Sequence, residues 1–126
     1  MEQNKRKVLL VEDNEQNAYL ARFLLEEAGL LVVHAETAAA ALEMASRDQH
    51  DIILLDIQLP DADGYQVAAK LRQDEKYRTA PIIAVSSFAM PNERERAYEA
   101  GCNGYIEKPI APSTFVEQVC SFLTAA

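Results

Sequence analysis

The segment Ile52-Ile53-Leu54-Leu55 is apolar at four successive positions and ends on Asp56. A strand that faces water on one side alternates apolar and polar residues, so this pattern predicts a strand that is covered on both faces. Such strands belong to parallel sheets that are enclosed by helices. The segment therefore favours an α/β fold with a central parallel sheet.

The rest of the chain alternates short apolar runs with stretches of helical periodicity, which predicts five strand–helix units. We expect strands at residues 7–11, 31–35, 51–56, 81–86 and 104–107, and helices at residues 15–28, 37–47, 65–72, 91–101 and from 112 onward. Gly29 can end the first helix with a positive φ, and Thr37 is the expected N-cap of the second. Pro91 and Pro112 are expected in the first turns of the fourth and fifth helices.

Each helix should present one apolar stripe to the sheet. The expected inward residues are Leu20, Ala21, Leu24 and Ala28 in the first helix, Ala38, Ala41, Leu42 and Ala45 in the second, Val67, Ala68 and Leu71 in the third, and Phe115, Val116, Val119, Phe122 and Leu123 in the fifth.

The size of the chain suits one domain with one packed core. It has 126 residues, of which 49% are hydrophobic, and we expect a single domain over residues 1–126 with its core at about residues 7–123. Residues 1–7 lack the apolar centre of a signal peptide, and no apolar stretch is long enough to span a membrane. Cys102 and Cys120 have no metal-ligand spacing. A cytoplasmic protein with reduced thiols is expected.

Polar side chains stand at the ends of four of the five expected strands. They are Glu12 and Asp13 after the first strand, Asp56 on the third, Ser86 on the fourth and Lys108 after the fifth. In an open parallel sheet the carboxyl ends of the strands meet at one edge, where ligands bind. We therefore expect these side chains to converge.

Three carboxylates in one place repel each other strongly unless a cation neutralises them. A hard divalent ion with oxygen ligands suits this set, so Mg²⁺ is the expected metal, with Mn²⁺ as an alternative. His34 and His50 are isolated and are expected to be strand-end or loop residues. The net charge of −8 (12 basic and 20 acidic residues) argues against direct nucleic-acid binding.

The carboxylate of Asp56 is the expected nucleophile towards phosphorus, because it stands alone on the central strand. Glu12 and Asp13 are adjacent and are the expected metal platform. The metal and Lys108 would neutralise the charge on the transferring oxygens, and Ser86 would donate a hydrogen bond to one of them.

Short motifs across the whole chain carry a resemblance to a known family. They are Val-Glu-Asp-Asn at 11–14, Leu-Leu-Asp-Ile-Gln-Leu-Pro at 54–60, Gly64, Pro-Ile-Ile-Ala-Val-Ser at 81–86, Ala-Gly-Cys at 100–102 and Gly-Tyr-Ile-Glu-Lys-Pro at 104–109. The chain resembles the receiver domains of bacterial two-component response regulators, in the CheY-like superfamily. The resemblance implies a doubly wound (βα)₅ flavodoxin-like fold whose five parallel strands follow the order 2-1-3-4-5.

The resemblance also implies roles for the residues of the site. Asp56 would be the phosphoacceptor, and Asp13, Asp56 and the backbone carbonyl of Gln58 would ligate Mg²⁺ directly. Glu12 would act through a water, and Lys108 would pair with the phosphoryl group. The phosphodonor would be a histidine kinase or a histidine phosphotransfer protein. The chain would catalyse transfer to its own Asp56 and its own dephosphorylation, without turnover of an external substrate, and is therefore not expected to be an enzyme in the usual sense.

The signal would leave through the switch residues of the family. Ser86 occupies the switch-hydroxyl position and Tyr105 the aromatic switch position, and the loop 87–92 would move with them. The downstream protein partner would bind the face made by the fourth helix, fifth strand and fifth helix, near Arg94, Tyr98 and Glu107. No membrane contact is expected.

Within the family, Asp-Ile-Gln-Leu-Pro at 56–60 and Phe-Ala-Met at 88–90 look most like single-domain regulators of the DivK kind, although similar receivers occur in hybrid sensor kinases. Three other classes fit less well. An aspartyl phosphatase would have an acid at position 58, where Gln58 stands, and a flavin-binding module would have a phosphate loop in place of the acidic residues 12–15. A degenerate receiver that only binds partners would lack part of the site.

Overall fold

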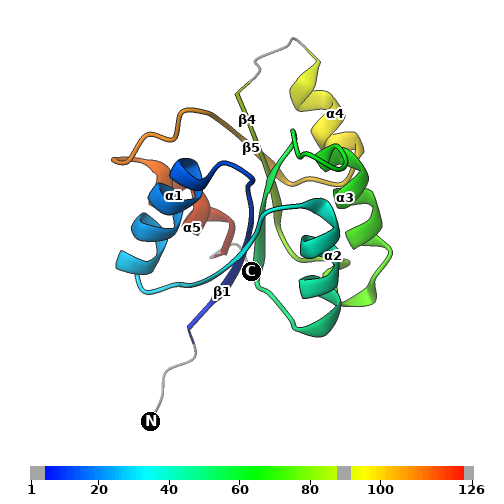
Figure 1. The fold of residues 1–126 in the computed structure, drawn as a ribbon, viewed down its shortest axis with the longest axis horizontal. Coiled ribbons are helices and arrows are strands. Elements are labelled where there is room, and N and C mark those ends of the chain that lie inside the picture. The colour runs from blue at the N-terminus through cyan, green and yellow to red at the C-terminus, as the bar shows by residue number, and fades with distance from the viewer. Residues whose placement is uncertain (1–4, 88–91, 124–126) are drawn as a thin grey trace.

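The described residues, 5–87 and 92–123 of a computed structural model, build a five-stranded parallel sheet (Figure 1). The strands are β1 (Lys7–Val11), β2 (Leu31–Ala35), β3 (Ile52–Asp56), β4 (Ile82–Ser86) and β5 (Gly104–Glu107). Their order is β2-β1-β3-β4-β5, and every neighbouring pair is parallel. The predicted (βα)₅ fold with strand order 2-1-3-4-5 is confirmed.

Helices cover both faces of this sheet. They are α1 (Glu15–Glu27), α2 (Ala38–Arg47), α3 (Gly64–Arg72), α4 (Glu93–Glu99) and α5 (Phe115–Leu123), with a short 3₁₀ helix η1 (Glu75–Tyr77). Figure 1 shows α1 and α5 on one side of the sheet, at the left of the view, and α2, α3 and α4 on the other.

The two faces of the sheet bury two separate apolar clusters. Along β1, Val8 and Leu10 face the cluster under α1 and α5, and Leu9 and Val11 face the cluster under α2 and α3. All five residues of β3 are buried. The unbroken apolar pattern of this strand thus reflects its central position, with helices on both faces.

The packing face of α1 differs from the predicted stripe. The buried residues of α1 are Ala18, Ala21 and Leu25. Leu20 and Leu24 are half-buried, and Ala28 is exposed. Ala28 is exposed because it is the C-cap residue and lies beyond the last helical turn, and Gly29 then reverses the chain with a φ of +93°.

The predicted stripes of the other helices are confirmed in their central positions. Buried residues are Ala38, Ala41 and Ala45 of α2, Val67, Ala68 and Leu71 of α3, and Phe115 and Val119 of α5, and the remaining predicted positions, Leu42, Val116, Phe122 and Leu123, are half-buried. Because its buried residues are alanines, α2 can approach the sheet closely.

The predicted start of α5 was wrong by three residues. The helix begins at Phe115, and residues 112–114 form a turn in which the N–H groups of Thr114 and Phe115 both donate to the carbonyl of Ala111. Pro112 therefore opens this turn rather than the helix. The predicted N-terminal role of Pro91 lies outside the described residues, and the 3₁₀ helix η1 was not predicted.

Arg72 forms hydrogen bonds at the edge of the sheet at which β4 and β5 begin. Its Nε and Nη2 atoms donate to the carbonyl of Gly101, at 3.0 and 2.8 Å. Its Nη1 atom donates to the carbonyls of Tyr77 and Ala80, at 2.6 and 2.7 Å, and Nη2 also donates to Oδ1 of Asn103 at 2.7 Å. One guanidinium thus joins the end of α3 to the segments that lead into both strands.

A buried tyrosine fastens the same edge near β3. The hydroxyl of Tyr77 lies 2.9 Å from the carbonyl of Ala45, 2.8 Å from that of Asp48 and 3.0 Å from Nδ1 of His50. Both rings are buried. Burial lowers the pKa of His50, and the nearby charge of Lys7 adds to this effect.

This environment predicts a specific dependence of stability on pH. The pKa of His50 in the folded protein lies below its ordinary value of 6.5, so the unfolded chain binds a proton first as pH falls. Stability is therefore lost as pH falls below the unfolded value, with a slope of at most about 1.4 kcal/mol per pH unit. Urea unfolding of the His50→Gln variant should show a shallower loss between about pH 7 and pH 5. An unchanged slope would contradict the assignment.

Candidate functional site

The register of the central strands brings the predicted site residues to one edge of the sheet. Asp56 on β3 is paired with Val85, so Ser86 lies one residue beyond it on β4. Glu12 follows Val11, which is paired with Leu55. The N–H of Lys108 donates to the carbonyl of Ser86 at 2.8 Å, which continues the β4–β5 pairing past the strand ends.

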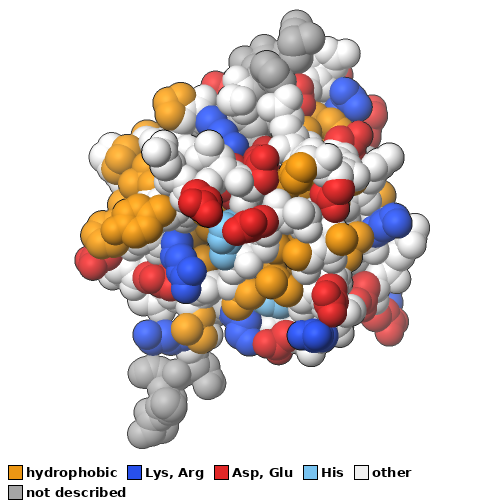
Figure 2. All heavy atoms as spheres, viewed as in Figure 1, with side chains coloured by type: hydrophobic (Ala, Val, Ile, Leu, Met, Phe, Trp, Pro, Cys, Tyr) orange, Lys and Arg blue, Asp and Glu red, His pale blue; other side chains and the backbone are white. Residues whose placement is uncertain are grey.

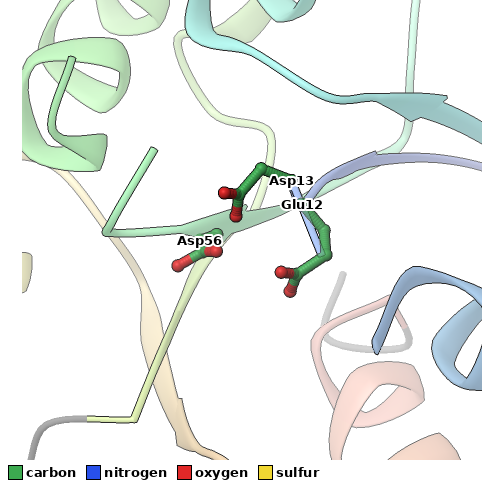
Figure 3. A group of neighbouring side chains, drawn as sticks. All are labelled: Glu12, Asp13 and Asp56. Carbon is green, nitrogen blue, oxygen red and sulfur yellow. The ribbon is translucent and has the colours of Figure 1, made fainter. Parts of the chain in front are cut away.

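Three carboxylates lie together at this edge (Figure 3). Glu12, Asp13 and Asp56 each offer an oxygen atom, and these atoms all lie within 4.8 Å of one another. Glu12 and Asp56 are both 4% exposed, whereas Asp13 is open to solvent. The predicted convergence of these three acids is therefore present in the structure.

The Lys108 ammonium contacts two of the three acids. Its Nζ atom lies 3.0 Å from Oε1 of Glu12 and 3.3 Å from Oδ2 of Asp56. All three side chains are largely buried, so these contacts are screened by water far less than surface ion pairs are. Lys108 thus holds the pair of buried carboxylates together without neutralising all three acids.

The excess of negative charge changes the acid–base behaviour of the site. Burial, together with the charge of Glu12, raises the pKa of Asp56 to about 6, although the N–H of Gln58 and the charge of Lys108 act in the opposite direction. Burial by itself would lower the pKa of Lys108, but the hydrogen bond to Glu12 and the charge of Asp56 outweigh it and raise that pKa. The surroundings therefore favour the protonated, positively charged form of Lys108 and disfavour the ionised form of Asp56.

The backbone around Glu12 is fixed from β2. The N–H of Glu12 donates to the carbonyl of Ala35 at 3.0 Å, and Nε2 of His34 donates to the carbonyl of Glu12 at 2.7 Å. His34 was expected at a strand end or in a loop, and it is the second-to-last residue of β2. Its support of the Glu12 backbone was missed, because no local pattern links residues that are 22 positions apart.

The loop from β3 to α3 folds back tightly against Asp56. The N–H of Gln58 donates to Oδ1 of Asp56 at 3.0 Å, Gln58 forms a bridge with Asp63, and the N–H of Gly64 donates to the carbonyl of Ile57 at 2.7 Å. A Cβ atom at Gly64 would lie 2.7 Å from the carbonyl oxygen of Asp56, which is too close for any side chain. Glycine at this position lets the loop close over the end of β3.

The two predicted switch residues lie on neighbouring strands, Ser86 on β4 and Tyr105 on β5. Ser86 is fully buried at the end of β4. Tyr105 is half-buried on β5, and the guanidinium of Arg94 in α4 lies 4.9 Å from the centre of its ring. This contact is a cation–π interaction between two of the elements of the predicted partner face.

A second tyrosine contact on α4 was not predicted from the sequence. The hydroxyl of Tyr65, in α3, donates to the carboxylate of Glu93, which is buried, and Arg96 lies 4.5 Å from the centre of the Tyr65 ring. Residues 65 and 93 are 28 positions apart, so no periodicity or motif connects them. Residues of α4 therefore contact one tyrosine of α3 and one of β5.

An exposed aromatic pair marks the outer side of α1. Tyr19 and Phe23 are 72% and 49% exposed, and their rings stack with centres 6.4 Å apart. Hydrophobic side chains gather over α1 at the left of Figure 2. The pair lies outside the predicted partner face, and the strand-end argument does not account for it.

The donor set fits a hard divalent cation. Within the described residues, the cluster offers carboxylate oxygens from Glu12, Asp13 and Asp56, and it includes neither histidine nor cysteine. Oxygen ligands around a site of excess negative charge suit Mg²⁺ or Mn²⁺ rather than zinc. A bound cation would also offset the burial and the repulsion from Glu12 that raise the pKa of Asp56.

Comparison with known proteins agrees with this arrangement of sheet and acids. The family of the response regulator receiver domain matches residues 8–120, and the chain belongs to this family. It is therefore a receiver domain of two-component signalling, and this is a family of signalling regulators rather than of classical enzymes. None of the helices in the described parts of the chain has the length and apolar character needed to cross a membrane.

Individual relatives match over nearly the whole chain. The polar-differentiation response regulator DivK of Brucella ovis is 42% identical over 118 residues, which cover 94% of this chain and 96% of that protein. The structure of the chemotaxis protein CheY4 of Vibrio cholerae has a TM-score of 0.91 and 25% identity, and the match covers 95% of this chain and 100% of that one. The receiver domain of a sensor histidine kinase of Pseudomonas aeruginosa, solved with a magnesium ion in its active-site cleft, has a TM-score of 0.89 and 31% identity, and the match covers 97% and 100%.

The raised pKa of Asp56 predicts that this residue destabilises the fold at neutral pH. Since its folded pKa of about 6 exceeds the ordinary 3.8, the folded state binds more protons between these values, and stability falls as pH rises through that window. In the presence of a chelator, Asp56→Asn should raise the free energy of unfolding by about 1 to 2 kcal/mol at pH 7.

The same measurement at about pH 4 provides the internal control, because Asp56 is then almost fully protonated in the folded state and most of the cost of burying its charge is gone. The stability difference between the variant and the wild type should shrink there. A less stable Asp56→Asn variant at pH 7 would show that the Lys108 contact outweighs the burial of the charge.

Proposed function

We propose that Asp56 accepts a phosphoryl group from a histidine kinase or a histidine phosphotransfer protein in a Mg²⁺-dependent reaction. The observation that carries this proposal is the position of the buried Asp56 carboxylate, 3.3 Å from the Lys108 ammonium and within 4.8 Å of Glu12 and Asp13. The family membership of the chain supports it. We propose that this reaction takes place in the cytoplasm.

The residues of the site have separate tasks in the transfer. A carboxylate oxygen of Asp56 attacks phosphorus, and the bond from phosphorus to the donor histidine nitrogen breaks, which leaves an acyl phosphate on Asp56 and a histidine that takes up a proton. Lys108 places its positive charge beside the transferring oxygens. The N–H of Gln58, 3.0 Å from Oδ1 of Asp56, keeps the carboxylate oriented.

The metal would be held by oxygen atoms of the same edge. Asp13, Asp56 and the backbone carbonyl of Gln58 would ligate Mg²⁺ directly, with Mn²⁺ as an alternative, and Glu12 would bind a coordinated water. The metal, when bound, supplies a positive charge that stabilises the transferring oxygens. The magnesium ion in the active-site cleft of the Pseudomonas aeruginosa receiver supports Mg²⁺ as the metal.

The output in this proposal is a changed surface on α4, β5 and α5. Ser86 would donate a hydrogen bond to a phosphoryl oxygen, and Tyr105 would change its position against Arg94, which now lies 4.9 Å from the centre of its ring. The phosphoryl group would shift the balance between two arrangements of this face, which a downstream partner protein then reads. Residues 88–91 of the predicted mobile loop lie outside the described residues.

Phosphorylation by a small phosphodonor tests the reaction directly. The protein is incubated with acetyl phosphate and Mg²⁺, and its intact mass is measured. We expect a gain of one phosphoryl group, because the site carries its own nucleophile, Asp56, and its own positive charge, Lys108. The gain should be absent from Asp56→Asn and from samples with excess chelator. Phosphorylation of Asp56→Asn at wild-type level would show that another residue is the acceptor, and no gain with any donor would leave a module that only binds partners.

Tyr105 provides a separate test of the output. Tyr105→Ala removes the ring that contacts Arg94, so we expect it to weaken binding of the downstream partner by roughly tenfold, as for an aromatic residue at the centre of an interface. The rate of phosphorylation by acetyl phosphate should change little. Tyr105→Phe keeps the ring and is the matched control. Equal losses of phosphorylation and partner binding in Tyr105→Ala would contradict a relay role.

A further inference from the structure

The loop between β3 and α3 is tied to a helix that contributes no residue to the proposed site. The carboxylate of Asp61, in the middle of this loop, accepts hydrogen bonds from the N–H groups of Ala38 at 2.8 Å and Ala39 at 3.1 Å. Both donors are in the first turn of α2, where helix N–H groups have no partner within the helix. The two bonds hold the pKa of Asp61 below its ordinary value.

The rest of the loop is fixed at its two ends. At the start, the N–H of Ile57 donates to the carbonyl of Val85 at 3.1 Å. At the end, the N–H of Gly64 donates to the carbonyl of Ile57, and the side chain of Asp63 accepts from the N–H of Gln66 and caps α3. Between these two ends, the hydrogen bonds of Asp61 join the middle of the loop to α2.

This tether restrains the segment that carries Gln58. The loop is short, and Gln58 forms a bridge with Asp63 across it, so a displacement of its middle is transmitted to the Gln58 peptide. That peptide donates its N–H to Asp56 and is the proposed source of a carbonyl ligand for the metal. Groups that fix the orientation of a metal ligand raise the affinity of the site by reducing the rearrangement needed on binding.

We propose that Asp61 is a positioning residue for the divalent-cation site, because its two hydrogen bonds to the N-terminus of α2 hold the loop so that the Gln58 carbonyl is set for Mg²⁺. The inference rests on the proposed function, since it assigns a task at the same site. It gives Asp61, an exposed loop residue without contact to the metal, a measurable effect on metal affinity.

The second N-cap of the same helix provides a matched control. The hydroxyl of Thr37 accepts from the N–H of Ala40 at 3.1 Å, so Thr37→Ala also removes a cap of α2. It leaves the Asp61 bonds in place. If the stability of α2 controls Mg²⁺ affinity, both variants should bind Mg²⁺ more weakly. If the position of the loop controls it, only Asp61→Ala should do so.

Mg²⁺ titrations of the full chain, followed by backbone amide NMR shifts of Gln58 and Gly64, test the proposal. We expect Asp61→Ala to weaken Mg²⁺ binding by roughly tenfold, the lower end of the loss seen when a group that orients metal ligands is removed. Asp61→Asn, which keeps one acceptor oxygen, should fall between Asp61→Ala and the wild type. Thr37→Ala should bind Mg²⁺ as the wild type does.

Hydrogen exchange provides a readout that does not depend on the metal. In chelator, the amides of Ala38 and Ala39 should exchange faster in Asp61→Ala than in the wild type, which confirms that the tether is broken.

Three results would overturn the inference. Wild-type Mg²⁺ affinity in Asp61→Ala would overturn it and leave the proposed function intact. Equal weakening in Asp61→Ala and Thr37→Ala would assign the effect to the stability of α2. No Mg²⁺-dependent shift in the wild type would overturn the proposed function and this inference together.

Discussion

The parallel alignment of the three central strands is the constraint on which the rest of the structure depends. Because β1, β3 and β4 run in the same direction with matched register, their carboxyl ends bring Glu12, Asp56 and Ser86 to one edge. Helices on both faces exclude water from the strands, and so the carboxylate of Asp56 is buried where it meets Glu12. The fold thus creates a concentration of negative charge that it only partly neutralises through Lys108.

The sequence predicted those features that depend on local pattern and on the direction of strands. The alternation of apolar runs with helical stretches predicted the five helices, and the polar residues at four strand ends predicted the convergence of Glu12, Asp13, Asp56 and Lys108. The strand order was implied by the resemblance to receiver domains. The roles assigned to these residues in phosphoryl transfer remain predictions. The errors of the fold concern the packing face of α1, the unpredicted η1 and a helix boundary at Pro112, where a turn and a helix start have the same local sequence preferences.

Contacts between residues distant in the chain were beyond reach of such patterns. The Tyr65–Glu93 hydrogen bond and the support of Glu12 by His34 join polar side chains that carry no periodic signal. The bonds from Asp61 to α2 belong to the same class: the sequence shows an acidic residue in a turn-rich loop, and its partner amides appear only when the helix is placed beside it.

The hydrogen bonds of Arg72 limit which parts of the sheet can move when the site changes. The guanidinium holds carbonyls on both connections that lead into β4 and β5, and the buried Tyr77 hydroxyl secures the end of α2 beside them. A shift of either connection breaks hydrogen bonds to a half-buried cation, which is costly. These hydrogen bonds resist movement at the edge where β4 and β5 begin, so a rearrangement costs less free energy at the opposite edge, where the acids lie.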